Sequence, residues 1–258
     1  MRILLTNDDG FQAPGLQTLY RVLAETKRHQ ICIVAPERQQ SATGRAVTLH
    51  KPLFLTRHEL SCGGQGVAVA GTPTDCIKLA LQGDILTFRP ELVLSGINAG
   101  PNLGSDVFYS GTVAAAMESM LLGVKAFALS LAVKLFTGKM DFDHGAAFVR
   151  DVLLEDEVLN SYEGLLNINF PDHPQEEWQG YCLARLGRRA FLNRFETRES
   201  PLGREYYWVY GSQPEEEAEG TDQEAISRGC VSITPLLGDL TDYTELEKLV
   251  CHQGTVNK

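Results

Sequence analysis

The chain has 258 residues, of which 43% are hydrophobic, and this size allows one large or two small domains with a substantial core. Its formal net charge of −10 disfavours a broad electrostatic grip on DNA or RNA, which needs many clustered cations. The longest apolar stretch, residues 113–124, contains Glu118 and is too short to span a membrane, and no signal peptide precedes the first predicted strand.

The cysteines show neither CxxC nor the Cys/His spacing of a zinc site, so thiols in a reducing compartment fit them better than disulfides do. Together with the missing leader, they predict a cytoplasmic globular protein. We assign no chemistry to the six residues, which are Cys32, Cys62, Cys76, Cys182, Cys230 and Cys251.

Short apolar runs alternate with helical patterns through the first two thirds of the chain. This alternation predicts an α/β fold with a parallel sheet covered on both faces, in which ligands bind beyond the carboxyl ends of the strands. In chain order we predict strand 3–5, helix 15–24, strands 31–34 and 46–49, helix 75–81, strand 92–94, helix 111–122, strand 126–131, helix 144–154 and strand 165–170.

From about residue 185 the pattern changes to alternating aromatic and charged residues, including Tyr-Tyr-Trp-Val-Tyr at 206–210. This alternation predicts hairpin arms on the α/β body, followed by an acidic loop at 213–220 that contains Glu215, Glu216 and Glu217. A run of arginines favours a solvated surface or a subunit contact over a phosphate site. Its members are Arg185, Arg188, Arg189, Arg194, Arg198 and Arg204.

Asn7-Asp8-Asp9-Gly10 ends the first apolar run and is the most informative segment of the chain. Such a segment could be a hairpin turn or a helix cap, but the residues after Gly15 follow helical rather than strand spacing. Two like charges ~4 Å apart repel by roughly 4 kcal/mol at an effective dielectric constant of ~20. The pair therefore indicates a hard divalent cation at this strand end.

Two further strand exits carry polar residues. The loop 35–44 contains Ser41, which could be a hydroxyl ligand or a turn former. The segment 95–104 has three glycines at intervals of four and offers the amide oxygen of Asn98. Neither the dinucleotide fingerprint nor a Walker A loop fits this spacing.

Ser110, Gly111 and Thr112 begin a predicted helix, whose free amides suit an anion, although a plain Ser or Thr cap explains them equally well. Residues 71–75 also begin a helix, and here the capping pattern favours a structural role. A metal beside a phosphate accounts for the polar strand ends together.

These motifs resemble those of the SurE family of stationary-phase survival proteins, which are metal-dependent nucleotidases, and the match runs through most of the chain. The segments that carry the resemblance are residues 4–10 (LLTNDDG), 35–38 leading to Ser41, 71–76, 95–102, 109–113, 167–171, 220–222 and 231–236.

The resemblance implies that Asp8, Asp9, Ser41 and Asn98 hold one divalent ion per subunit, Mg²⁺ or Mn²⁺. It implies hydrolysis of nucleoside 5′- and 3′-monophosphates and, in some members, of short polyphosphates. The implied fold is a single Rossmann-like α/β domain over residues 1–258, with three layers, a parallel-rich sheet and C-terminal β-hairpin arms at 185–210. Such arms are exchanged between subunits of a homodimer or homotetramer. No polynucleotide or membrane partner is expected.

Asp8 and Asp9 are expected mainly as ligands, and either one could also accept a proton from the attacking water. Asn98, together with the amides and hydroxyls of Ser110, Gly111 and Thr112, is expected to bind the substrate. Gln39 and Gln40 depart from the charged residue that many relatives carry there, which leaves substrate preference open. The competing hypothesis is a non-catalytic regulatory module that binds a metal–nucleotide complex.

Overall fold

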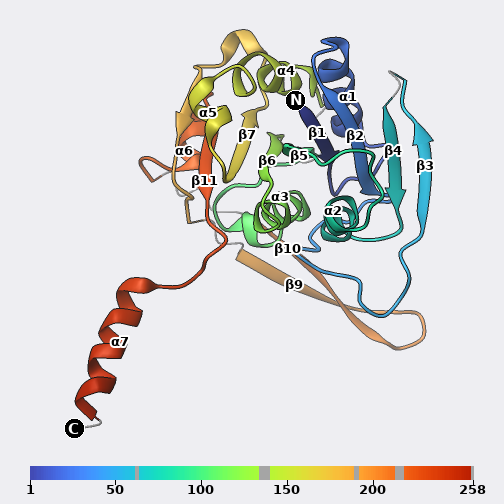
Figure 1. The fold of residues 1–258 in the computed structure, drawn as a ribbon. Coiled ribbons are helices and arrows are strands. Elements are labelled where there is room, and N and C mark those ends of the chain that lie inside the picture. Colours follow the sequence, from blue (N-terminus) through green and yellow to red (C-terminus); the bar gives the residue numbers. More distant parts are fainter. Residues whose placement is uncertain (62–63, 134–139, 189–191, 213–217, 257–258) are drawn as a thin grey trace.

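A nine-stranded mixed sheet forms the centre of the computed structural model, which describes residues 1–61, 64–133, 140–188, 192–212 and 218–256 (Figure 1). The strand order is β3-β4-β2-β1-β5-β6-β7-β11-β8, and the five neighbouring strands from β4 to β6, together with β7, run parallel. Their bounds are β1 Arg2–Thr6, β2 Gln30–Pro36, β3 Leu55–Glu59, β4 Gln65–Val69, β5 Leu92–Ala99, β6 Lys125–Ala132, β7 Leu165–Pro171, β8 Tyr181–Leu183 and β11 Val231–Leu236.

Helices cover both faces of this sheet, as Figure 1 shows with α1 and α4 above it and α2 and α3 below it. One apolar cluster joins α1 to its face through Leu16, Leu19 and Leu23. A second cluster joins α2 and α3 to the other face through residues such as Ile77 and Val113. The helices are α1 Pro14–Glu25, α2 Pro73–Gln82, α3 Gly111–Leu121, α4 Asp143–Phe148, α5 Glu157–Ser161, α6 Asp222–Ser227 and α7 Tyr243–Val256; the shorter turns are η1 Gly104–Phe108, η2 Val149–Leu153 and η3 Gln175–Glu177.

Strand β1 lies in the middle of the parallel region. Leu4 faces one apolar cluster while Ile3 and Leu5 face the other, which is why this strand reads as a continuous apolar run. Thr6, its last residue, pairs with Ser95 of β5. The carboxyl ends of these neighbouring strands therefore lie at the same edge of the sheet, and the predicted three-layer α/β fold is confirmed.

The predicted strand at 46–49 is wrong. The structure has no strand there, because Asp75 at the start of α2 accepts hydrogen bonds from the amide (2.9 Å) and the hydroxyl (2.7 Å) of Thr48. The sheet edge is instead built by β3 and β4, which follow this segment, and β3 pairs antiparallel with β4. Strand β11 also pairs antiparallel, with β7, so the sheet is mixed rather than wholly parallel.

Two other boundaries differ from the sequence prediction. Strand β5 continues through Asn98 to Ala99, with a register shift between Ser95 and Asn98, so the glycine-rich segment starts inside the strand. The predicted helix 144–154 is divided into α4 and the π-helical turn η2.

A hairpin and a helix project from the body in different directions (Figure 1). The hairpin consists of β9 (Leu192–Glu199) and β10 (Glu205–Ser212), which pair antiparallel as a separate sheet, so a hairpin in the expected region is confirmed. The C-terminal helix α7 was not predicted. Arg189, Cys62 and the loop residues Glu215, Glu216 and Glu217 lie outside the described residues.

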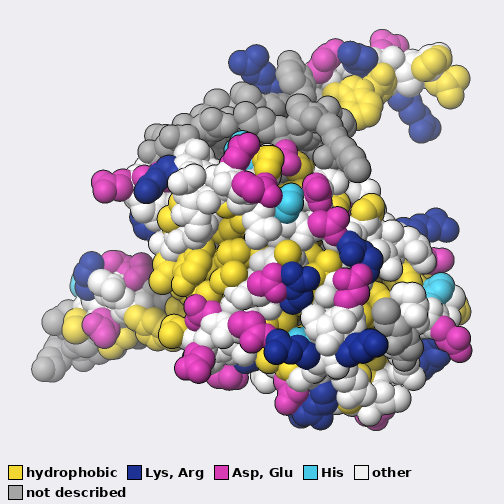
Figure 2. Space-filling view, turned by 90° about the horizontal axis from the view of Figure 1, so that it is seen from above, with side chains coloured by type: hydrophobic (Ala, Val, Ile, Leu, Met, Phe, Trp, Pro, Cys, Tyr) yellow, Lys and Arg dark blue, Asp and Glu magenta, His cyan; other side chains and the backbone are white. Residues whose placement is uncertain are grey.

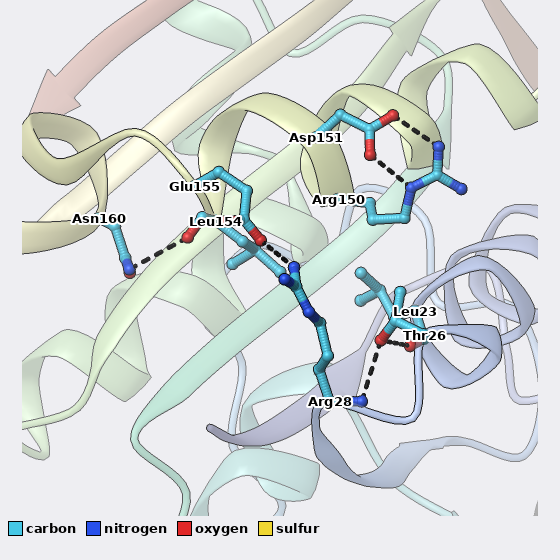
Figure 3. A network of polar contacts seen from close by, with 8 residues as sticks. All are labelled: Leu23, Thr26, Arg28, Arg150, Asp151, Leu154, Glu155 and Asn160. Carbon is cyan, nitrogen blue, oxygen red and sulfur yellow. Dashed lines mark hydrogen bonds and ion pairs between the residues drawn. The ribbon is translucent and has the colours of Figure 1, made fainter.

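One exposed ion pair joins the loop after α1 to the segment after η2, and a second lies within η2 (Figure 3). Arg28 Nη1 lies 2.6 Å from Glu155 Oε1, and Arg150 pairs with its neighbour Asp151. Such exposed pairs contribute about 0–1 kcal/mol each, so the apolar clusters rather than these contacts hold the layers together. Among the described residues, no helix is long and apolar enough to cross a membrane.

Gly15 allows α1 to pack closely on β5, and this contact can be tested. A Cβ at position 15 would lie 2.0 Å from the carbonyl oxygen of Ile97, which is backbone and cannot rotate away. In Gly15→Ala the gain in helix propensity, about 1 kcal/mol, is outweighed by overpacking of roughly 2 kcal/mol or more. We expect a lower midpoint of urea unfolding than in the wild type. Thr18→Ala in the same helix is the control, and equal or greater stability of Gly15→Ala would contradict the packing described.

Candidate active site

The two aspartates at the end of β1 sit on a turn that their neighbours build. The side-chain amide of Asn7 donates to the carbonyl of Gly10 (2.9 Å), and the amide of Gly10 donates back to Asn7 Oδ1 (3.2 Å). Gly10 adopts a positive φ of 106°, which glycine tolerates. The carbonyl of Asp8 also accepts from the amide of Gln40 (2.7 Å), which fixes the turn against the next loop. The turn is therefore the support of the carboxylate pair.

Asp8 is almost fully buried, with 4% of its surface exposed. Its Oδ1 accepts a hydrogen bond of 2.5 Å from the hydroxyl of Thr112, at the start of α3. Burial raises the pKa of Asp8 to about 6; the Thr112 hydrogen bond opposes this shift and the nearby charge of Asp9 adds to it.

Asp9 connects three segments. Its Oδ2 accepts from the backbone amide of Ala99 at the end of β5 (3.1 Å), and its Oδ1 lies 3.5 Å from the side-chain nitrogen of Gln39. Burial raises the pKa of this carboxyl group, while the hydrogen bonds from Ala99 and Gln39 lower it. Asp9 thus lies where β1, β5 and the loop after β2 meet.

Ser41 and Asn98 lie on the two segments that meet Asp9. The amide nitrogen of Gln39 donates to the hydroxyl of Ser41 (2.9 Å), so Gln39 bridges Ser41 and Asp9. Asn98 is the neighbour of Ala99 in β5, and its side-chain nitrogen donates to the carbonyl of Gly100 (2.8 Å). That bond leaves the amide oxygen of Asn98 as the atom suited to a cation.

The donor set fits a hard divalent cation. Asp8, Asp9, Ser41 and Asn98 supply oxygen atoms, which Mg²⁺ and Mn²⁺ prefer. Within the described part of the chain, no Lys or Arg forms an ion pair with either aspartate, so the buried Asp8 and the partly buried Asp9 lack a counter-charge. The described residues contain no cluster of three or more His, Cys, Asp or Glu that could hold a metal, and any ion here relies on the two neutral donors as well.

The start of α3 lies directly against Asp8. A Cβ at Gly111 would come within 2.7 Å of the Cβ of Asp8 and 2.8 Å of its Oδ2, so only glycine fits there. The hydroxyl of Ser110 caps the helix by accepting from the amide of Val113 (3.1 Å), while the hydroxyl of Thr112 donates to Asp8. Both hydroxyls expected at a phosphate therefore have partners within the chain. The first backbone amides of α3 remain the better phosphate donors.

Residues 71–75 have the structural role that the capping pattern favoured. Thr72 and Asp75 form a capping box at the start of α2. Burial acts to raise the pKa of Asp75, but the hydrogen bonds that it accepts from Thr48 and Thr72 outweigh this effect and lower it. This segment pins residues 46–48 and supplies no ligand to the carboxylate pair.

The sequence analysis missed three contributors to this site. Gln39 was noted only as a departure from relatives, although it contacts both Asp9 and Ser41. The amide of Ala99 has no side-chain signal at all. Asn102 anchors the loop after β5 by accepting from Asn167 and Asn169 at its carbonyl (2.8 and 3.2 Å). The alternating asparagines in a strand otherwise apolar are the signal that could have revealed this anchor.

Comparisons with known proteins agree with these motifs. The family model described as Survival protein SurE matches residues 3–193. The chain is 52% identical over 249 residues to the 5′-nucleotidase SurE of Desulfitobacterium hafniense (strain Y51), covering 96% of each protein. It is 44% identical over 251 residues to the 5′-nucleotidase SurE of Carboxydothermus hydrogenoformans, covering 96% of this chain and 95% of that protein. The crystal structure of the SurE protein from Aquifex aeolicus superposes with a TM-score of 0.79 at 35% identity, covering 98% of this chain and 100% of that one.

The raised pKa of Asp8 predicts how the stability of the metal-free protein depends on pH. In the metal-free protein the folded state binds this proton more tightly than the unfolded chain, so stability is lost as the pH rises from about 4 to about 6. Asp8→Asn removes this titration. We expect the free energy of unfolding of the metal-free variant to exceed that of the wild type by on the order of 2 kcal/mol at pH 7.5 but by little at pH 4.

Urea unfolding in EDTA at both pH values measures this difference, and Glu176→Gln on the surface is the control. A wild-type protein that is more stable than Asp8→Asn at pH 7.5 without metal would show that the carboxylate is not strained.

Proposed function

The chain belongs to the survival protein SurE family, and we propose on that basis that it is a metal-dependent 5′-nucleotidase, a hydrolase that releases phosphate from nucleoside monophosphates. The observation that carries this proposal is the carboxylate pair of the buried Asp8 and the partly buried Asp9 beside the N-terminus of α3. A cation centre and an anion-binding helix end side by side are what phosphate monoester hydrolysis requires.

We assign Asp8, Asp9, Ser41 and Asn98 as ligands of one divalent ion per subunit, Mg²⁺ or Mn²⁺. When bound, such an ion supplies Lewis-acid polarisation of a phosphate oxygen and lowers the pKa of a water molecule. The chain's own contacts orient the ligands beforehand: Thr112 fixes one carboxylate, Ala99 fixes the other, and Gln39 holds Ser41.

The backbone amides of Gly111 and Thr112 are the proposed donors to the phosphoryl oxygens, aided by the positive end of the α3 dipole. Uncatalysed monoester hydrolysis is slow enough to need accelerations up to ~10²¹, so cation and amide donors must act together. Asp8 or Asp9 accepts the proton of the attacking water. Either carboxylate is mainly a ligand, because a nearby cation lowers its pKa and weakens it as a base.

The finer substrate range is also a proposal. We infer from the family that nucleoside 3′-monophosphates and short polyphosphates are further substrates. Long polynucleotides are not, because the chain carries a net charge of −10 and acidic and basic side chains are interspersed on the face in Figure 2. A cytoplasmic location is supported by the five described cysteines, all of which are free.

We further propose that residues 1–258 form one α/β domain whose hairpin at 185–210 assembles a homodimer or homotetramer. A two-stranded sheet is marginal in water on its own. Among the described side chains of β9 and β10, Phe195, Trp208 and Val209 are more than half exposed. Such exposed apolar side chains are typical of protein interfaces. Helix α7, with exposed Leu249 and Val250, offers a second apolar surface.

Metal dependence and the role of Asp9 can be tested together. We expect phosphate release from AMP to stop in excess EDTA and to return with Mn²⁺, because the proposed ligands are all oxygen donors. Asp9→Asn should lower kcat/KM by roughly 100-fold or more while the fold persists, since it removes a charged ligand. Asp156→Asn, which alters another aspartate at a helix start, is the control.

Full turnover after confirmed metal removal would contradict the proposal. Metal-dependent binding of AMP without phosphate release would favour the non-catalytic regulatory module instead. Cleavage of plasmid DNA under the same conditions would contradict a site built for small monoesters.

The assembly role of the hairpin can be tested by deleting residues 186–209 and joining the ends with a short glycine linker. We expect a smaller mass in sedimentation, because the deletion removes the exposed apolar surface of the arm. Replacing Phe195 and Trp208 by serine keeps the hairpin's length and should lower the mass in the same way. A folded deletion variant with the parent's mass would show that another surface, such as α7, holds the assembly.

A further inference from the structure

Asp222 is a fully buried carboxylate outside the metal site, at the first position of α6. It accepts three backbone hydrogen bonds: Oδ2 from Gly104 (2.7 Å), and Oδ1 from Gly187 (2.9 Å) and Gln223 (3.0 Å). The bond to Gln223 lies within the start of α6. The other two donors are 118 and 35 residues away along the chain, so Asp222 joins segments that the fold brings together.

Gly104 begins the stretch that enters the candidate phosphate site. It is the first residue of η1, whose Asp106 accepts from the amides of Tyr109 and Ser110 at its carbonyl (3.0 and 3.1 Å). Ser110 is the cap of α3. The carbonyl of Tyr109 also accepts from the amide of Gly44, in the loop that carries Ser41 (3.0 Å). The position of Gly104 therefore bears on the helix end that faces phosphate.

The segment just before Gly104 is anchored separately, through Asn102. The amide of Asn102 donates to Asn169 Oδ1 (2.8 Å), and the Asn102 side chain donates to Ser130 (2.7 Å). These bonds tie Asn102 to β6 and β7 of the sheet. Two residues later, the amide of Gly104 donates instead to Asp222, which belongs to α6 and not to a strand of the sheet.

Gly187 lies at the base of the hairpin arm, between the bridge of Arg185 to Thr221 and strand β9. A Cβ at this position would come within 2.0 Å of Gln223 Oε1 and 3.3 Å of Asp222 Oδ1. A side chain at position 187 would therefore displace the Gln223 side chain and crowd the Asp222 carboxylate. One buried side chain contacts both the base of the arm and the loop that leads into α3.

We propose that Asp222 is a positioning residue that couples the base of the hairpin arm to the loop 104–110 and, through it, to the phosphate-binding end of α3. The inference rests on the proposed function, in which α3 binds phosphate and the arm mediates assembly. Strain at the arm base is transmitted to Gly104 through the carboxylate of Asp222. The backbone of Asp8 and Asp9 is held by the Asn7–Gly10 turn, and the start of α3 contacts Asp8 through the Thr112 hydroxyl.

Asp222→Asn is the most direct test of this link. When the side-chain oxygen of the asparagine accepts from Gly187 and Gln223, its side-chain NH2 group faces the amide of Gly104, and that hydrogen bond is lost. We expect faster hydrogen–deuterium exchange over residues 104–110 in the full-length variant. We also expect kcat/KM for AMP to fall roughly tenfold or more, as loss of a hydrogen bond to a charged group implies, with a smaller change in the Mn²⁺ concentration for half-maximal activity. Asp156→Asn, another aspartate that accepts amides of its own helix, should leave both readouts unaltered.

Gly187→Ala perturbs the link from the arm side without changing the carboxylate. We expect it to speed exchange over residues 104–110 as well, and its effect should be non-additive with that of Asp222→Asn because both act through one bond network. If Asp222→Asn does not fold, Gly187→Ala alone decides by the same exchange measurement.

Exchange over residues 104–110 that stays at the wild-type rate, or strictly additive effects of the two variants, would overturn the coupling and leave Asp222 as a local support of α6. A wild-type protein without nucleotidase activity would refute the proposed function. The exchange measurement would still decide the coupling in that case.

Discussion

Two neighbouring carboxylates, one buried and one partly buried, lie at the end of β1, and the arrangement of the candidate site follows from the repulsion between them. Burial raises the pKa of Asp8 and of Asp9, and the groups around them reduce the strain only in part. Thr112, Ala99 and Gln39 offer neutral hydrogen-bond donors, not a full positive charge. A centre left short of positive charge binds a cation more strongly than one already neutralised by a lysine or arginine.

The packing of α3 places its first backbone amides, the proposed phosphate donors, beside the carboxylate pair. Val113 and Ala116 of α3 lie in the apolar cluster beneath the sheet, and this packing places the start of the helix at Asp8. The approach is possible because residue 111 is glycine, as a Cβ would collide with the Asp8 side chain. Core packing and site chemistry are therefore set by the same helix, so a change that shifts α3 alters both.

Sequence patterns revealed those parts of the fold that local spacing encodes. An apolar run followed by Asp8 and Asp9 and then by helical spacing placed the carboxylates correctly at a strand end. The prediction of a strand at 46–49 was wrong because the contact that determines this segment's conformation, between Thr48 and Asp75, joins residues 27 apart in the chain. Strand β3 is largely exposed, so it lacks a clear apolar pattern. The backbone amide of Ala99 and the buried link through Asp222 depend on tertiary neighbours and carry no periodic signal.

The distance along the chain between the parts of the site has a consequence for biosynthesis. Asp8 and Asp9 leave the ribosome well before their partners Ala99 and Thr112, which follow 90 and 104 residues later. A nascent chain carries the acidic pair long before β5 and α3 exist to orient it. The cation centre can thus form only after the middle of the sheet has been translated, which keeps incomplete chains from acquiring an ordered metal site.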